Sequence, residues 1–450
     1  MRLMRIILPA LVLTCAFVLS SGRGFTQVTA AMPKDNASTA PNGDRAAAAD
    51  TIPAGTAITM ANWQNYRQFM PDGMIALFEG TYSWKMPPDV RMEVGPTVIH
   101  PLPKNYVDAT EKYSGQVKVV ALADGGLTLE GYRGGIPFPN PSEPHKGWKV
   151  LANVWYRYQP HLLVDTYGYG CSMSSGGNIN CQTYKAVKHQ FSYNTDPGVP
   201  ADNTGDNEKY FTEWYMTLEP EQDKYTTELT VNYADLARPE ELYVFLPSLR
   251  RYQALSTKAR CSPQQGMDFT PEDFHNGFDS NMTELQVDYV SHKKILALVD
   301  AAPPQAAFPE GYDMPLGWPT PSWGKWQVRD SDVISMQKIP SKASGYCYGK
   351  RVMYADSHFY NALWEDLYDP EMRLWKLEGI FPAATEVPGI GLVNTAASDV
   401  EELWDIRNNH ASIGAEPSPG HPFYVNEQAP KEYDDLPRYT TPGGLNMIQR

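Results

Sequence analysis

Apolar and polar residues alternate along most of this chain, a pattern typical of half-buried β-strands. In residues 115–135 the alternation runs on both sides of Asp124-Gly125-Gly126, which suits a tight turn, so this segment predicts a hairpin. Tyr, Trp, Phe, Thr and Val dominate the alternating runs, as strands prefer. The same pattern recurs in residues 153–170, 209–235, 241–256 and 282–300. The chain is therefore predicted to be mainly antiparallel β.

Residues 356–376 combine acidic and aromatic side chains and raise the question of a catalytic carboxylate cluster. Alternation from Phe359 to Tyr368 predicts a strand, and Asp369-Pro370 suits the first two positions of a turn. Glu365 and Asp366 are neighbours in that strand and point to opposite faces, so they cannot act on one sugar. We interpret the stretch as a hairpin with an acidic tip rather than a catalytic site.

Helical patterns are fewer. Residues 59–80 have helical spacing and predict one or two short helices. In residues 268–278, Thr270 is the expected N-cap and Pro271 the first helical residue, which leaves Glu272 and Asp273 in the first turn, where acids are favoured. After Asn408 the chain is rich in Pro, Gly and Asn and is expected to run over the surface.

Residues 1–31 have a basic start, an apolar run and a small-residue exit, which predicts a cleaved signal peptide and a periplasmic location. Cys15 lies in the middle of the apolar run, so a lipid anchor there is disfavoured. Residues 32–55 are expected to be a flexible linker and residues 56–450 a single domain. No other apolar segment is long enough to predict a stable membrane span.

The charge balance excludes some partners. The whole chain has a formal charge of −14, and loss of three leader arginines leaves 35 basic against 52 acidic residues, or −17. This field repels phosphate backbones, so no nucleic-acid partner is expected.

Four cysteines remain beyond the leader. Cys171 and Cys181 flank a Gly/Ser/Asn-rich turn, so we pair them, and Cys261 is then left to pair with Cys347. Buried free thiols are the alternative.

Motifs for catalysis or metal binding are missing: the chain has no H-E-x-x-H, G-x-S-x-G, Walker or G-x-G-x-x-G sequence. The nine histidines stand singly, without an i, i+4 pair. His358 near Asp356 could be an acid–base pair, but a strand histidine with local hydrogen bonds is the favoured interpretation. We expect no catalytic residue, no metal and no cofactor.

Aromatic residues make up 12% of the chain, with 27 Tyr and 11 Trp. Such rings fill cores, but a sheet rich in them could also line an apolar cleft for a lipid-like ligand. Three Trp in residues 318–327 could instead form a sugar-binding platform. The side chains predicted to line a hydrophobic cleft are Trp148, Trp155, Tyr156, Phe245, Tyr360 and Trp364.

Five segments resemble, in order and spacing, the domain-of-unknown-function family 1329. They are "GGIPFPNPSEPHKGWKVLANVWYRY", "ELYVFLPSLRRYQALS", "SPQQGMDFTPEDF", "GKRVMYADSHFYNALWEDLYDPEMRLWK" and "YTTPGGLNMIQR". These exported bacterial proteins are related to outer-membrane lipoprotein-sorting proteins of the LolA/LolB group. The resemblance implies an α+β, mainly β fold: a strongly curved antiparallel sheet forming an unclosed barrel, with a few helices on its concave side.

The resemblance also implies a non-enzymatic periplasmic carrier or binding protein for a lipid or other hydrophobic molecule. Partners implied are an RND-type exporter and an outer-membrane protein. It transfers no catalytic residue, and Arg250 and Arg251, which match its motif, are as consistent with capping the sheet edge as with function. Long insertions at 195–210 and 300–325 depart from the shorter carriers. An envelope carbohydrate-binding or glycan-processing protein and a purely structural envelope partner remain as alternatives.

Overall fold

One antiparallel sheet dominates the structure, a computed structural model that describes residues 51–201, 208–256, 260–264, 266–302, 308–416 and 420–448. The described residues all belong to one compact unit, residues 50–450. The predicted signal peptide, Cys15 and nearly all of the predicted linker lie outside the described residues.

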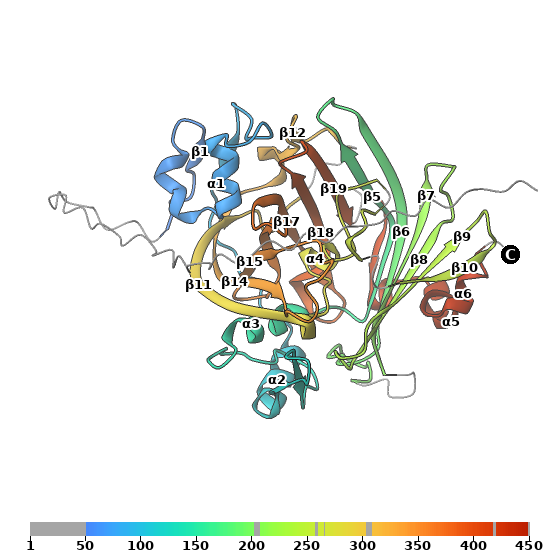
Figure 1. Ribbon diagram of the computed structural model, residues 1–450. Coiled ribbons are helices and arrows are strands. Elements are labelled where there is room, and N and C mark those ends of the chain that lie inside the picture. The colour runs from blue at the N-terminus through green and yellow to red at the C-terminus, as the bar shows by residue number, and fades with distance from the viewer. Residues whose placement is uncertain are drawn as a thin grey trace, which may run out of the picture. The chain divides into compact units, whose positions relative to one another are not determined.

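The sheet has 14 strands in the order β10-β9-β8-β7-β6-β5-β19-β18-β17-β16-β15-β14-β11, with β20 also paired to β5. Its members are β5 (Leu162–Met173), β6 (Ile179–Gln190), β7 (Lys209–Glu219), β8 (Thr227–Tyr233), β9 (Glu241–Leu246), β10 (Arg251–Leu255), β11 (Leu285–Ala297), β14 (Gln327–Lys338), β15 (Lys350–Asp356), β16 (Ala362–Tyr368), β17 (Leu374–Val387), β18 (Gly391–Asp405), β19 (His410–Glu416) and β20 (Phe423–Val425). Within the described chain β10 and β11 are the two edges and do not pair, so the sheet curves without closing into a barrel (Figure 1).

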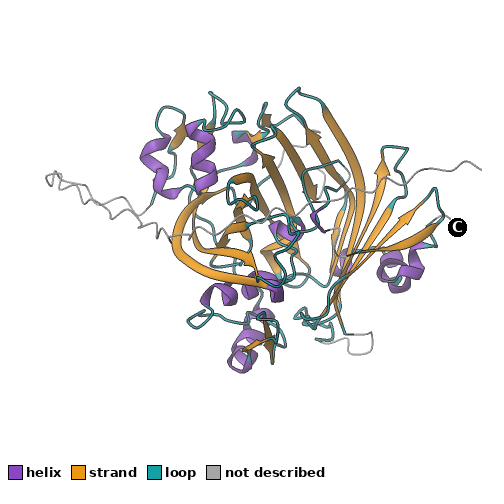
Figure 2. Cartoon of the chain, viewed as in Figure 1, coloured by secondary structure: helices purple, strands orange, loops and turns teal. Residues whose placement is uncertain are grey.

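The remaining elements are short (Figure 2). Three two-stranded pairs are formed by β1 (Ala57–Thr59) with β2 (Arg91–Glu93), β3 (Lys118–Ala121) with β4 (Leu127–Glu130), and β12 (Tyr312–Asp313) with β13 (Trp318–Pro319). The α-helices are α1 (Asp72–Glu79), α2 (Lys104–Tyr113), α3 (Lys146–Trp155), α4 (Phe274–Gly277), α5 (Leu436–Thr440) and α6 (Pro442–Leu445). The 3₁₀ turns are η1 (Trp63–Phe69), η2 (Ser114–Gln116), η4 (Met282–Glu284), η5 (Pro321–Trp323), η6 (Asn426–Gln428) and η7 (Lys431–Asp434).

Helices cover both faces of the sheet. We call the concave face, which carries Glu365 on β16, the inner face, and the opposite one, which carries Asp366, the outer face. Helix α1 contacts β16 and β17 on the outer face, where Asp366 accepts from the Gly73 backbone N–H at 3.1 Å. Helix α4 contacts the same two strands from the inner side. Helix α3 packs on β11 and β14 at the inner face, and α5 and α6 lie over β7 to β10 on the outer face.

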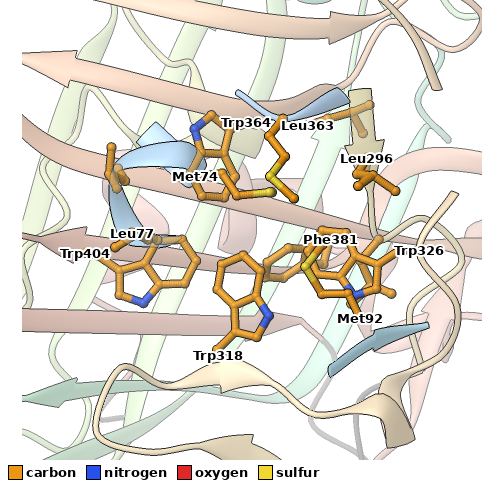
Figure 3. Close-up of a cluster of buried hydrophobic side chains, with 14 of the residues drawn as sticks. Met74, Leu77, Met92, Leu296, Trp318, Trp326, Leu363, Trp364, Phe381 and Trp404 are labelled. Atoms are coloured by element: carbon orange, nitrogen blue, oxygen red, sulfur yellow. The ribbon is translucent and has the colours of Figure 1, made fainter. Parts of the chain in front are cut away.

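The outer face of β16 to β18 is buried under an aromatic core (Figure 3). Trp318 and Trp326 stack with their ring centroids 5.4 Å apart, and Trp404 lies 5.5 Å from Trp318 and 5.7 Å from Trp364. The segment containing β12 and β13 therefore holds the sheet from outside, together with α1.

Several predicted elements are confirmed. The acidic-tipped hairpin forms as β16 and β17, in which Glu365 lies opposite Glu378 in the backbone register. The hairpin of residues 115–135 forms as β3 and β4, and the short helices of residues 59–80 are η1 and α1. Mainly antiparallel β architecture with an unclosed sheet is confirmed as well.

Three expectations are wrong. The helix near Thr270 starts at Phe274 with Asp273 as its N-cap, because Thr270 instead hydrogen-bonds Asp273 Oδ2 at 2.9 Å. The chain after Asn408 does not simply cover the surface: β19 lies in the middle of the sheet, between β18 and β5. Residues 153–155, the start of the strand pattern predicted for 153–170, instead end helix α3, whose apolar residues face the inner core at helical spacing.

Both predicted disulfides form. Cys171–Cys181 joins directly paired residues of β5 and β6, with Cα atoms 4.1 Å apart, and Cys261–Cys347 joins the chain before α4 to the loop before β15.

We predict that the two bridges contribute unequally to stability. Cys261–Cys347 spans 86 residues and Cys171–Cys181 spans 10, so removing the longer bridge with serines should cost about 2 kcal/mol more, because it restricts the unfolded chain more strongly. Urea unfolding of both double-serine variants measures the difference. Equal losses would show that native-state contacts, rather than loop length, set the contribution of each bridge.

Candidate functional site

A cavity of about 170 Å³ lies between the inner face of the sheet and the chain from Arg260 to Asp279. The strands supply its polar wall: β5, β6, β7, β18 and β19 contribute Asp165, Gln182, Tyr184, Tyr215, Glu401 and Glu416. The covering chain supplies apolar side chains, namely Met267, Phe269, Pro271 and Phe274. The cavity is thus amphipathic, with carboxyl groups on the sheet and aromatic rings opposite them.

Glycines in the strands make room for the cavity. Gly414 on β19 lines it, and a Cβ added there would meet no atom within 4 Å. Gly168 on β5 is different, since a Cβ there would lie 2.5 Å from the Tyr184 ring and 2.6 Å from Asp165 Oδ2. The glycine at Gly414 therefore leaves open space, and the one at Gly168 lets the side chains of Tyr184 and Asp165 approach the backbone.

One cation lies in the cavity wall between an acid and two rings. Lys188 Nζ on β6 is 2.9 Å from Glu213 Oε1 on β7 and 3.0 Å from His275 Nδ1, and it sits 4.5 Å from the centre of the Phe211 ring. Burial lowers the pKa of His275 to about 3, with help from the positive charge of Lys188, so the imidazole is neutral at pH 7. Burial opposes ionisation of Glu213, but Lys188 outweighs it and holds the pKa of Glu213 below its usual range. The group is an ion pair at neutral pH rather than a reactive acid–base pair.

Arg260 organises the other side. Its guanidinium is 2.8 Å from Glu240, 2.5 Å from Glu272 and 3.4 Å from Asp279. It also donates to the Pro271 carbonyl at 2.9 Å. These contacts fix the covering chain across the cavity and balance the positive charge of Arg260.

Asp165 and Glu416 face the cavity without such a partner. No lysine or arginine in the described part of the chain forms an ion pair with either of them. Burial raises the pKa of Glu416 to about 7, and the carboxylate of Glu213 adds to the effect. Burial and the nearby Glu416 raise the pKa of Asp165 well above its ordinary value. Asp165 Oδ1 accepts from the Tyr167 N–H at 3.0 Å, whereas Oδ2 is buried with no hydrogen-bond partner among the described atoms.

The six aromatic residues predicted to line a cleft are not brought together. All are buried, and none lines the 170 Å³ cavity. Trp148, Trp155 and Tyr156 belong to the inner-face core under α3, and Trp364 belongs to the outer-face core. Phe245 packs under α5 and α6, and Tyr360 packs in a separate cluster with Tyr106 and Tyr158. Trp155 does border a second cavity of about 20 Å³. Ligand binding by these six residues stays a prediction.

Other residues singled out from the sequence have structural positions. Arg250 and Arg251 are exposed at the turn into edge strand β10, which is the sheet-edge position expected for them. The tryptophans of residues 318–327 are buried, each at 3% exposure or less, so they offer no open face to a sugar. Asp356 accepts from the N–H of His358 at 2.7 Å and pairs with Arg329, as expected for a structural strand end.

The residues of the cavity were not found from the sequence. Asp165, Glu401 and Glu416 each follow a small or apolar strand residue, as solvent-facing strand residues often do, and nothing local shows that another segment covers them. The signal that could have found them is the weak one of glycines, Gly170 and Gly414, within strands that pair with each other.

Two general features complete the site. Among the residues with described positions, no group of three or more His, Cys, Asp or Glu side chains is arranged to hold a metal ion. None of the described helices combines the length and apolar character that a membrane crossing requires.

Comparison with solved structures returns low similarity. A proposed outer membrane lipoprotein-sorting protein domain from Vibrio parahaemolyticus has 11% identity and a TM-score of 0.44, covering 68% of this chain and 99% of its own. A DUF1329 family protein from Desulfovibrio piger ATCC 29098 has 13% identity and a TM-score of 0.43, covering 66% and 100%. A LolA superfamily protein from Nitrosomonas europaea has 12% identity and a TM-score of 0.35, covering 63% and 92%.

Sequence comparison is more decisive. A search of curated proteins found no match. A family model described as "Protein of unknown function (DUF1329)" matches residues 57–445, which is nearly all of the described chain. The chain belongs to the DUF1329 family.

Proposed function

We propose that this protein is a non-enzymatic carrier that binds a small hydrophobic or amphiphilic molecule in the inner-face cavity. The observation that carries the proposal is the cavity itself, which lies between the sheet and the covering chain and is lined on one side by Met267, Phe269 and Phe274. Its volume of about 170 Å³ is close to that of an engineered cavity of about 150 Å³ that binds benzene. It would take a ring or a short stretch of alkyl chain.

The energetics fit reversible binding. Each buried methylene contributes about 0.8 kcal/mol, so six of them contribute about 5 kcal/mol before the cost of ordering the ligand. A binding free energy of this size gives a weak affinity, which suits a carrier that must also release its ligand. Carriage needs no proton transfer, and the ionisable groups Lys188, Glu213 and Arg260 already have partners within the protein.

We place this activity in the bacterial periplasm, with an RND-type exporter and an outer-membrane protein as partners. Support comes from the two disulfides, which suit an oxidising compartment, and from the leader pattern in the sequence.

Filling the cavity is expected to abolish binding. Gly414→Leu places a branched side chain where a Cβ meets no other atom, and Gly414 does not have a positive φ, so the strand should accept it without strain. Isothermal titration of the purified chain with 1-octanol should give saturable binding for the wild type and at least a tenfold loss of affinity for the variant.

Gly115→Leu is the matched control. Gly115 is an exposed residue of η2, far along the chain from the cavity, and it likewise has open space around an added Cβ. The control should bind 1-octanol as the wild type does. Wild-type protein that shows no 1-octanol binding, or equal binding by Gly414→Leu, would contradict the proposed function.

A further inference from the structure

We infer that the cavity selects ligands whose polar end is an organic cation, an alkyl- or arylammonium group attached to an apolar tail. This inference rests on the proposed binding function and names the class of molecule bound. It is carried by three features of the cavity: its charge balance, an unpartnered buried oxygen, and the aromatic rings opposite.

The charge balance favours a cation. The lining contains the acids Asp165, Glu213, Glu228, Asp279, Glu401 and Glu416 and the bases Lys188, Arg260 and His275. Both permanently basic groups are already matched, Lys188 by Glu213 at 2.9 Å and Arg260 by Glu240 at 2.8 Å and two further acids. An ammonium ion brought in by a ligand could therefore interact with the other carboxyl groups without displacing Lys188 or Arg260 from their partners.

Asp165 supplies the second feature. The residue is 2% exposed and lines the cavity, and its Oδ2 has no hydrogen-bond partner among the described atoms. A buried polar atom without a partner costs free energy, and an N–H group of a ligand would supply the missing bond. Glu416, on the neighbouring strand β19, lines the same part of the wall. An ammonium group has enough donors to reach both.

The aromatic side chains supply the third feature. Phe269 and Phe274 stack with centroids 5.9 Å apart and line the cavity opposite the carboxyl groups. Cations are attracted to aromatic faces, and the attraction strengthens when water is excluded. The protein already holds one ammonium in this way, since Lys188 Nζ lies between the Glu213 carboxylate and the face of Phe211.

The same features disfavour an anionic head group. Glu416, with a pKa of about 7, is ionised at pH 8, so a fatty-acid carboxylate placed beside it would meet a like charge in a buried site. Lys188 and Arg260 could pair with it only by leaving Glu213 or Glu272 buried and unmatched. The cavity thus distinguishes an amine from a fatty acid of equal chain length.

Three ligands of equal chain length test the inference: octylammonium, 1-octanol and octanoate, titrated calorimetrically into the purified chain at pH 8. We expect the affinity for octylammonium to be at least about tenfold higher than that for 1-octanol, and the affinity for octanoate to be the lowest of the three. In the double variant Asp165→Asn/Glu416→Gln the ratio of octylammonium to 1-octanol affinity should fall toward one. Glu386→Gln, which removes an exposed acid of β17, should keep the wild-type ratio.

The outcomes separate the two proposals. Octanoate binding as tightly as octylammonium, or an unchanged ratio in the double variant, would overturn the cation inference while leaving the cavity as a binding site. Absence of binding by all three ligands would overturn the proposed function as well. If the double variant does not fold, Glu416→Gln alone should halve the ratio or lower it further, and an unchanged ratio again overturns the inference.

Discussion

Arg351→Met is expected to lower the free energy of unfolding at pH 7 by about 4 kcal/mol, because it leaves buried acids without their counter-charge. Arg351 on β15 is 1% exposed. Its Nε donates to Glu365 Oε2 at 2.9 Å, and its Nη1 donates to the Glu272 carbonyl at 2.8 Å and lies 3.5 Å from Asp273. It also donates to the Gly277 carbonyl. One side chain therefore ties the sheet to the chain that covers the cavity.

The measurement is urea unfolding followed by tryptophan fluorescence. Lys350→Met is the matched control: Lys350 is the preceding residue, is only half-buried, and lies 3.8 Å over the Tyr368 ring. It should lose less than about 1 kcal/mol. Equal losses for the two methionine variants would show that the Arg351 contacts are not what stabilises this region.

A second substitution identifies the cause of the loss. If uncompensated charge is responsible, adding Glu365→Gln to Arg351→Met should restore part of the lost stability, since the buried acid is then removed. If lost packing is responsible, the two changes should add. Where Arg351→Met fails to fold, Arg351→Lys provides the comparison, because lysine keeps the charge but loses the forked contacts to Glu365 and the two carbonyls.

Local patterns predicted the parts of this fold that depend on local chemistry. The turn at Asp369-Pro370 and the alternation before it were sufficient for the β16–β17 hairpin, and they also placed Glu365 and Asp366 on opposite faces. The structure confirms this, since Glu365 pairs with Arg351 on the inner face and Asp366 accepts from Gly73 on the outer face.

The site escaped prediction because burial on the inner face is set by a distant segment. In strands β18 and β19, Glu401 and Glu416 occupy alternate positions that are typical of a solvated face. They are covered only because residues 260–279, more than 120 positions earlier, cross over them. Aromatic content pointed instead to rings such as Trp148 and Trp364, which are large core residues.

Buried carboxyl groups on both faces of the sheet predict an unusual pH dependence. Burial raises the pKa of Glu365, Asp366 and Glu416 to about 7 each. Burial also raises the pKa of Glu402 well above its ordinary value, with no opposing cation. A raised carboxyl pKa means that the folded protein binds more protons than the unfolded chain between about pH 4.5 and 7, so the stability is present below pH 4.5 and is lost as pH rises.

Other acids lower the stability of the protein at acidic pH. Burial opposes ionisation of Glu272, but Arg260 outweighs it and lowers the pKa of Glu272, so that contribution is lost as pH falls below about 4. Stability should therefore be greatest near pH 5. Between pH 5 and 8 the free energy of unfolding should fall by about 3 kcal/mol or more, since a single group raised from 4.5 to 7 accounts for about that amount.

Glu402→Gln measures how much one carboxyl group contributes to this fall in the free energy of unfolding between pH 5 and 8. Glu402 on β18 is fully buried on the outer face, and neither carboxyl oxygen has a hydrogen-bond partner among the described atoms. Glutamine keeps the shape and cannot ionise, so the variant should match the wild type at pH 5 and exceed it by about 2 kcal/mol at pH 8. Urea unfolding at both pH values tests this, with exposed Glu386→Gln as the control that should follow the wild type throughout. Parallel pH curves for Glu402→Gln and the wild type would mean that Glu402 is not held neutral by burial, because removing its charge would then have no pH-dependent effect.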